Sequence, residues 1–154
     1  MAREVNFLFD TSDGRLRSAG SLLRLRDHGG HQLITFKGAP RFRGAIKERP
    51  EFETRIGDFT SMIEILERLG FGVFMRYEKD REEWLIGEVS VVLDHTPMGD
   101  FVEVEGPAEQ LEEIARSLGL EVATAVRGSY VSLWHEYRAS RPEQNLPLDM
   151  VFDE

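Results

Sequence analysis

The sequence predicts one α+β domain built mainly from antiparallel β-strands, with helices packed outside the sheet. Three observations predict this class. Eight short segments have strand composition and are separated by turn clusters. Only three segments have the spacing of an amphipathic helix. The chain has 154 residues, 41% of them hydrophobic, which is enough for one well-filled core and few for two.

The strand-like segments recur at the spacing of an antiparallel meander. They cover residues 5–9, 21–26, 32–37, 46–56, 73–79, 81–86, 89–94 and 100–105. Turn clusters such as T-S-D-G and D-H-G-G lie between them. Most of the chain is therefore predicted to be one sheet.

Apolar residues at helical spacing predict three helices, over residues 58–69, 107–119 and 129–139. Gly70 follows the first as a stop signal, and Pro107 is favourable in the first turn of the second. These elements place a single domain over residues 1–139. The C-terminal tail, residues 140–154, has two prolines and no periodicity, so we expect it to be either loose or laid across the body as an extended strap.

Composition excludes several classes of protein. The chain has no cysteine, so disulfides and thiolate zinc sites are ruled out. The net charge of -9, from 28 acidic and 19 basic residues, disfavours non-specific binding of nucleic acid. No segment approaches the roughly 20 apolar residues of a membrane span. We expect a cytoplasmic protein with neither a membrane nor a nucleic acid as its partner.

Charged residues occupy alternate positions in several predicted strands, so they share one face of each strand. Glu103 and Glu105, for example, alternate with Val102 and Val104. Seven basic residues follow this pattern together with four glutamates, which gives a local net charge of +3. They are Arg24, Arg26, Lys37, Lys47, Arg49, Lys79 and Arg81, with Glu51, Glu53, Glu103 and Glu105; Asp94 is placed in the same way.

Two interpretations of this charged face remain open from the residues alone. The face could be the ordinary wet side of a sheet. Alternatively, the sheet could close into a barrel with a polar lumen, wide enough for a small anionic ligand. Burying so many charges is costly unless they pair with one another, a metal ion or a ligand.

Seven short motifs resemble those of the CYTH superfamily, which is named for class IV adenylyl cyclases and thiamine triphosphatases and also includes inorganic triphosphatases. In family order they are F-D-T (9–11), L-R-L-R (23–26), T-F-K-G (35–38), R-P-E-F-E (49–53), K-D-R (79–81), L-D (93–94) and M-G-D-F-V-E-V-E (98–105). Each is weak alone, but their common order is specific. The resemblance covers most of residues 5–137.

The resemblance implies a tunnel barrel of about eight antiparallel strands that holds a triphosphate and Mg²⁺ or Mn²⁺. The substrate would be tripolyphosphate, thiamine triphosphate or ATP. The implied phosphate-binding residues are Arg24, Arg26, Lys37, Lys47, Arg49, Lys79 and Arg81, and the implied metal ligands are Glu51, Glu53, Glu103, Glu105 and Asp94. The implied catalytic residues are Lys79, Arg81, Glu103 and Glu105. Hard cations prefer such carboxylate oxygens, and phosphoryl transfer needs positioning and positive charge.

One departure from the family pattern concerns the first strand, which usually carries E-x-E-x-K and precedes a helix and the F-D-T strand. Here only eight residues precede Phe9, and they supply a single glutamate. We therefore expect one strand fewer than in the family and an exposed strand edge. We also expect weak catalysis, with the edge covered by a homodimer or by the chain's own tail.

Three functions fit these motifs. The first is a metal-dependent triphosphatase, in which water attacks the terminal phosphorus. The second is a class IV adenylyl cyclase, which makes cyclic AMP and pyrophosphate from ATP. The third is a non-catalytic module that binds polyphosphate or nucleotide.

Overall fold

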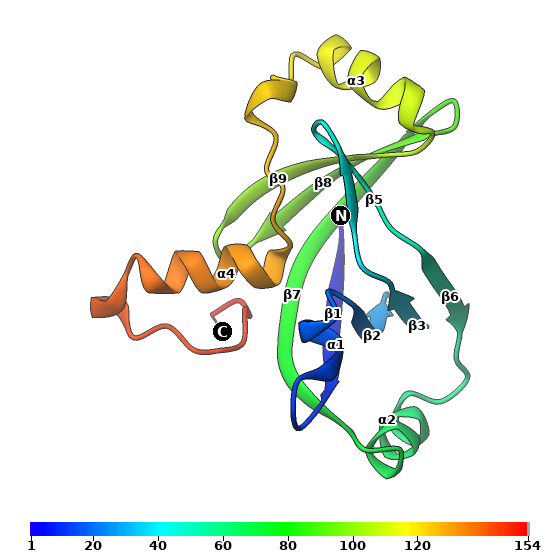
Figure 1. Cartoon of the computed structure of the whole chain (residues 1–154), viewed down its shortest axis with the longest axis vertical. Helices are drawn as coiled ribbons and strands as arrows, with labels where there is room; N and C mark the ends of the chain where they lie inside the picture. The colour runs from blue at the N-terminus through cyan, green and yellow to red at the C-terminus, as the bar shows by residue number, and fades with distance from the viewer. Residues whose placement is uncertain (154) are drawn as a thin grey trace.

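The computed structural model describes residues 1–153 and contains nine strands and four α-helices (Figure 1). The strands are β1 (Ala2–Thr11), β2 (Leu22–His28), β3 (His31–Lys37), β4 (Arg41–Arg43), β5 (Ile46–Glu48), β6 (Glu51–Arg55), β7 (Phe71–Ile86), β8 (Val89–Thr96) and β9 (Gly99–Glu105). The helices are α1 (Arg15–Ser18), α2 (Phe59–Arg68), α3 (Ala108–Ser117) and α4 (Tyr130–Ala139), with short 3-10 turns η1 (Val122–Thr124) and η2 (Pro142–Gln144). The predicted α+β class, dominated by an antiparallel sheet, is confirmed.

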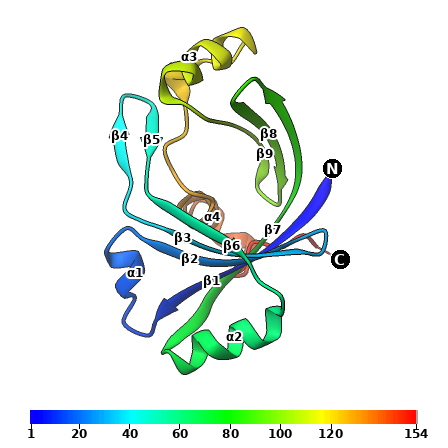
Figure 2. The ribbon, with the colours of Figure 1, turned by 90° about the vertical axis from the view of Figure 1, so that its right-hand side faces the viewer.

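Seven strands form one antiparallel sheet in the order β6-β3-β2-β1-β7-β8-β9, and β4 and β5 form a separate hairpin. Because neighbouring strands alternate in direction, the two end strands β6 and β9 run the same way. They therefore cannot close the sheet by pairing antiparallel with each other. Figure 2 shows the sheet curling, with the β4–β5 hairpin and the β8–β9 pair on opposite sides of its concave face.

The predicted division into strands was wrong in two places. Residues 46–56 form two strands rather than one, because Pro50 lacks the N–H that a continuous ladder needs. Residues 71–86 form one strand rather than two. The first part of β7 pairs with β1 and the last part pairs with β8, so Asp80 lies in both ladders and the charged K-D-R motif does not interrupt the strand.

The convex face of the sheet carries a hydrophobic core under α2. Phe9, Leu25 and Leu66 form its buried centre, with Phe59 and Met62 of α2 packed against it. The helix begins after Asp58, whose carboxylate accepts a hydrogen bond from the Ser61 amide. The register shifts between Leu8 and Phe9, and these two neighbours contribute to different cores.

A second core lies on the concave face, where α4 packs against the sheet. Leu8, Met75, Tyr77 and Trp134 are buried there together with Met150 of the tail. The expectation that the helices pack outside the sheet is therefore wrong for α4. Its aromatic residues cover one end of the concave face, and Figure 2 shows α4 behind the curl of the sheet.

The tail folds back onto the body as a strap. Met150 donates a backbone hydrogen bond to Arg76 O (3.0 Å) and accepts one from Glu78 N (2.8 Å). Arg76 and Glu78 belong to the part of β7 that precedes its pairing with β8. Trp134 Nε1 donates to Leu148 O (2.9 Å). These contacts show that residues 148–150 lie against the body, whereas Pro142–Gln144 form the 3-10 turn η2 instead of an extended segment. Residue 154, the last of the predicted tail 140–154, lies outside the described residues.

Within the part of the chain that the structure describes, no helix has the length and hydropathy needed to cross a membrane.

Candidate active site on the concave face of the sheet

The candidate site is built from alternate residues of strands that lie side by side in the sheet. The register aligns Arg24 with Thr35, and Thr35 with Glu53, across β2, β3 and β6. It likewise aligns Arg81 with Asp94 across β7 and β8. Because alternate side chains share a face, this register explains why the charged residues gather on the concave side.

Asp94 is the centre of a buried hydrogen-bond network. Its carboxylate is 0% exposed and accepts from Lys79 Nζ (2.7 Å), Arg81 Nε and Nη2 (2.7 and 2.6 Å) and Tyr130 Oη (2.7 Å). Burial alone would raise the pKa of Asp94, but hydrogen bonds from Arg81 and Lys79 outweigh it and hold that pKa at about 2. Asp94 therefore stays ionised and fixes both cations.

Arg81 connects three strands, because its Nη2 also donates to Glu103 of β9 (2.7 Å). Burial alone would lower the pKa of Arg81, but the negative charges of Asp94, Glu4 and Glu103 outweigh this effect and raise the pKa. The guanidinium therefore remains charged. Tyr130 has a raised pKa because it is buried and lies near Glu103 and Asp94. It is therefore a neutral hydrogen-bond donor.

Arg24 is buried on the neighbouring strand. It donates to Thr35 Oγ1 (3.2 Å) and Tyr77 Oη (3.4 Å) and lies 3.6 Å from Glu53 Oε2. Thr35 in turn donates to the same Glu53 oxygen (2.7 Å). The Nε of Arg24 is buried without a hydrogen-bond partner among the described residues.

Glu4 and Asn6 of β1 also lie in this site, although no sequence motif predicted a role for them. Glu4 Oε1 lies 3.3 Å from Arg26 Nη1, and Oε2 lies 3.6 Å from Lys79 Nζ. Asn6 accepts a hydrogen bond from Arg26 Nε (3.1 Å). Their alternation with Val5 and Phe7 was the available signal. This alternation could be assigned to the site only once β1 was known to lie at the centre of the sheet.

The predicted residues nearer the ends of the sheet are less tightly joined. Lys37 pairs with Glu51 (2.8 Å), and Glu105 is exposed on β9. Lys47 is exposed on β5, and its pKa is lowered by partial burial and by the positive charges of Arg49 and Lys37.

Arg49 is held by the backbone instead of by the charged cluster. Its guanidinium donates to Gly38 O (2.8 Å), Lys37 O (3.1 Å) and Gly20 O (3.2 Å). These bonds fix the turn that follows β3. Arg49 follows β5 and precedes Pro50, so the strand alternation that grouped it with Glu51 and Glu53 does not extend to it.

The carboxylates have the right chemistry for a hard divalent cation, but they are spread over two strands. Glu51 and Glu53 lie on β6, and Glu103 and Glu105 lie on β9, the two end strands of the sheet. Across residues 1–153, no three acidic or histidine side chains converge as a ready metal cage. Mg²⁺ is often held by only one or two carboxylates, with phosphate oxygens completing its coordination. The pairs on β6 and β9 fit that mode.

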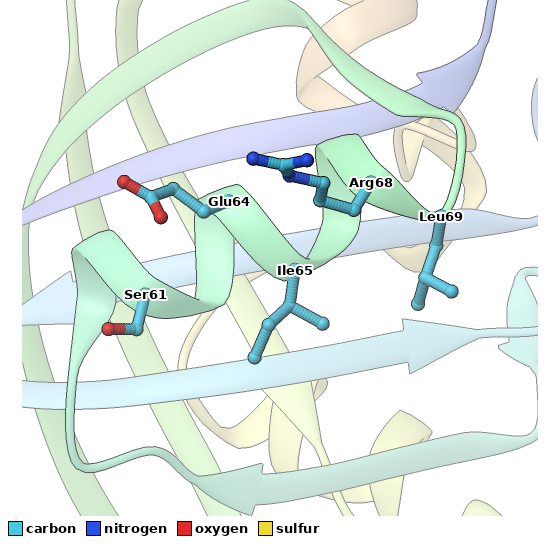
Figure 3. A pocket seen from close by; sticks show the side chains of 5 residues that line it. All are labelled: Ser61, Glu64, Ile65, Arg68 and Leu69. Atoms are coloured by element: carbon cyan, nitrogen blue, oxygen red, sulfur yellow. The ribbon is translucent and has the colours of Figure 1, made fainter.

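The outer surface of α2 carries a shallow depression of about 330 Å³. Figure 3 shows its lining, with Ile65 and Leu69 on the same side of the helix. None of the predicted site residues lines it, and α2 covers the convex face. The concave face is therefore the stronger candidate for chemistry.

Comparison with known proteins gives consistent matches over most of the chain. A family model described as the CYTH domain matches residues 3–130. A protein of Methanocaldococcus jannaschii named "Putative adenylate cyclase MJ0240" is 29% identical over 141 residues, covering 84% of this chain and 80% of the relative.

Solved structures agree with this match. The PH1819 protein of Pyrococcus horikoshii superimposes with a TM-score of 0.75 at 29% identity, over 90% of this chain and 87% of that one. A Hippeastrum protein described as having a dominant triphosphatase activity has a TM-score of 0.59 at 18% identity, over 97% of this chain and 86% of that one. The Hippeastrum likeness, at this identity, concerns the fold.

Proposed function

The chain belongs to the CYTH domain family, and on that premise we propose that it is a metal-dependent enzyme that hydrolyses a small-molecule triphosphate. The observation that carries this proposal is the gathering of Arg24, Arg26, Lys79 and Arg81 on one concave face. Four cations at one place suit a polyanion better than any neutral substrate. The candidate substrates are tripolyphosphate, thiamine triphosphate and ATP.

In this proposal the basic residues hold the phosphate oxygens and stabilise the charge that moves during phosphoryl transfer. Lys79 and Arg81 are already oriented by Asp94, and Arg24 by Thr35 and Tyr77. Lys37 and Lys47 would contact the outer end of the triphosphate. Two of the N–H groups of Arg49 already donate to the carbonyls of Gly38 and Lys37. Arg49 would have to break these hydrogen bonds before those groups could bind a phosphate oxygen.

Mg²⁺ or Mn²⁺ would be held by Glu103 and Glu105 on β9 or by Glu51 and Glu53 on β6. When bound, such an ion neutralises phosphate charge and favours attack at phosphorus. Asp94 is also in the proposed ligand set, but its four hydrogen bonds make it less available than the glutamates. We therefore assign Asp94 mainly to the positioning of Lys79 and Arg81.

Adenylyl cyclase activity is the second candidate, and the name of the M. jannaschii relative favours it. The same cations would bind the triphosphate of ATP, and the ribose 3'-hydroxyl would attack the α-phosphorus in place of water. A non-catalytic module that binds polyphosphate is the third candidate. It is favoured by the end strands β6 and β9, each of which pairs along one edge only within residues 1–153.

One experiment separates the three functions. The purified chain is incubated with tripolyphosphate, thiamine triphosphate or ATP in the presence of Mg²⁺ or Mn²⁺, and every product is identified. Release of inorganic phosphate supports the triphosphatase, and cyclic AMP with pyrophosphate supports the cyclase. Saturable binding without turnover would leave only the binding module.

A homodimer is part of the proposal. All five residues of β6 are exposed, and Phe52 on this end strand is 69% exposed. Unpaired strand edges with exposed apolar residues tend to pair with another chain. We expect light scattering after gel filtration to give the mass of two chains, and a monomer at micromolar concentration would contradict this part of the proposal.

A further inference from the structure

Glu4 is a buried carboxylate among the cations of the proposed site. It is 2% exposed and lies on β1, at the middle of the sheet. Its Oε1 atom lies 3.3 Å from Arg26 Nη1, 3.3 Å from His28 Nδ1 and 3.9 Å from Arg81 Nε. Its Oε2 atom lies 3.6 Å from Lys79 Nζ and has no hydrogen-bond partner among the described residues.

The contacts of Glu4 differ from those of Asp94, the other buried carboxylate of the site. Asp94 accepts four hydrogen bonds of 2.6 to 2.7 Å, which commit its lone pairs to Lys79, Arg81 and Tyr130. Every contact of Glu4 with a cation is 3.3 Å or longer. Glu4 therefore balances nearby positive charge without holding any one cation by a short hydrogen bond.

Burial normally makes an ionised carboxylate costly. Here burial would raise the pKa of Glu4, but Arg26, Lys79, Arg81 and Arg24 together lower it. The carboxylate thus keeps its charge because the cations surround it. Without it, the same cations would repel one another whenever no ligand is bound.

We infer that Glu4 is an internal counter-anion that pairs with the cations of the empty site and weakens the binding of polyphosphate. The inference rests on the proposed function, because it takes a polyphosphate as the ligand. Charge-assisted hydrogen bonds to phosphate oxygens are ordinarily about 2.7 to 2.9 Å long, shorter than the contacts of Glu4 with Arg26, Lys79 and Arg81, so a bound polyphosphate would compete with Glu4 for these cations. The Glu4 charge then stays buried beside the ligand, and its repulsion grows with the number of ligand charges.

This role makes Glu4 a determinant of specificity among anions. A ligand with one phosphate is repelled little, whereas tripolyphosphate is repelled by several charges at once. Removing the Glu4 charge should therefore strengthen tripolyphosphate binding more than phosphate binding. It should also destabilise the ligand-free protein, and tripolyphosphate should restore that lost stability.

The test compares Glu4→Gln with Glu78→Gln by calorimetric titration with phosphate, pyrophosphate and tripolyphosphate in the absence of divalent cations. Glu78 is the matched control, because it is 8% exposed and pairs with Arg3 and Arg76 on the other face of β7. Both variants change the total charge equally. Glu4→Asp keeps the charge and serves as a conservative rescue.

We expect Glu4→Gln to bind tripolyphosphate roughly tenfold more tightly than the wild type, with a gain that shrinks from pyrophosphate to phosphate. Glu78→Gln and Glu4→Asp should remain within about twofold of the wild type. If Glu4→Gln unfolds alone, refolding in tripolyphosphate should recover it, and failure to recover would count against the inference.

Failure of this inference is distinguishable from failure of the proposed function. If the wild type binds tripolyphosphate and Glu4→Gln binds it no more tightly, Glu4 is not a counter-anion and the proposed function stands. If only Glu4→Gln binds, the inference holds and the wild type is not a triphosphate enzyme. If neither binds, both are wrong.

Discussion

The substitution Asp94→Asn tests how strongly the buried carboxylate holds the two cations of the site. The pKa of Asp94 is about 2 instead of the ordinary 3.8, a difference worth about 2.5 kcal/mol in favour of the ionised form. Asparagine keeps the shape but loses the charge, and Lys79 and Arg81 lose their common partner. We therefore expect the free energy of unfolding to fall by about 2 to 4 kcal/mol at pH 7.

The pH dependence of this loss has a definite sign. A carboxyl group whose pKa is lowered by folding stabilises the native state above its unfolded pKa and loses that contribution as pH falls through its folded pKa. Urea unfolding of wild type and Asp94→Asn should therefore differ fully above pH 4, and the difference should shrink between pH 4 and pH 2. A difference that stays constant down to pH 2 would refute this reasoning.

Asp10 provides a matched control outside the site. Its buried carboxylate also has a pKa of about 2, because hydrogen bonds from the Leu16 and Arg17 amides outweigh its burial. Asp10→Asn should cost similar stability but change kcat/KM for tripolyphosphate by less than about twofold, whereas Asp94→Asn should lower it by roughly 100-fold. Equal activity losses in the two variants would mean that Asp94 acts only through the fold.

Three further predictions concern metal binding, substrate binding and the tail. Glu103→Gln should abolish metal-dependent phosphate release with an unchanged circular dichroism spectrum, and retained turnover would remove Glu103 from the metal ligands. Arg26→Ala should raise KM for tripolyphosphate by roughly tenfold in steady-state kinetics; an unchanged KM would show that Arg26 does not touch substrate. Met150→Ala should lower the free energy of unfolding by about 2 to 5 kcal/mol in urea, because Met150 is 0% exposed, and a loss under about 1 kcal/mol would mean the strap is not part of the core.

The side-chain pattern of β2, β7 and β9 was enough to predict which charged residues share a face. Period-two alternation is a local property, so Arg24 and Arg26 could be assigned to one face of their strand, and Glu103 and Glu105 to one face of theirs, without knowing the neighbouring strands. The order of the strands then brings those faces together, as the Arg81 contacts with Asp94 and Glu103 show.

Other parts of the site depend on contacts between residues far apart in the sequence. The tail has no periodicity, and only its packing on β7 shows why Met150 is buried. Tyr130 belongs to a helix that was expected outside, and its position near Asp94 depends on how α4 lies across the sheet. Arg49 was grouped with Glu51 by alternation, which fails at Pro50 because the strand is interrupted there.

A crystal structure of the chain with tripolyphosphate and Mg²⁺ would show directly whether the concave face binds the ligand. We expect phosphate oxygens within hydrogen-bond distance of Lys79 Nζ and the guanidinium groups of Arg24, Arg26 and Arg81, with the ion on the glutamates of β9 or β6. Tripolyphosphate bound elsewhere, for example on the outer surface of α2, with the concave face unchanged, would contradict this expectation.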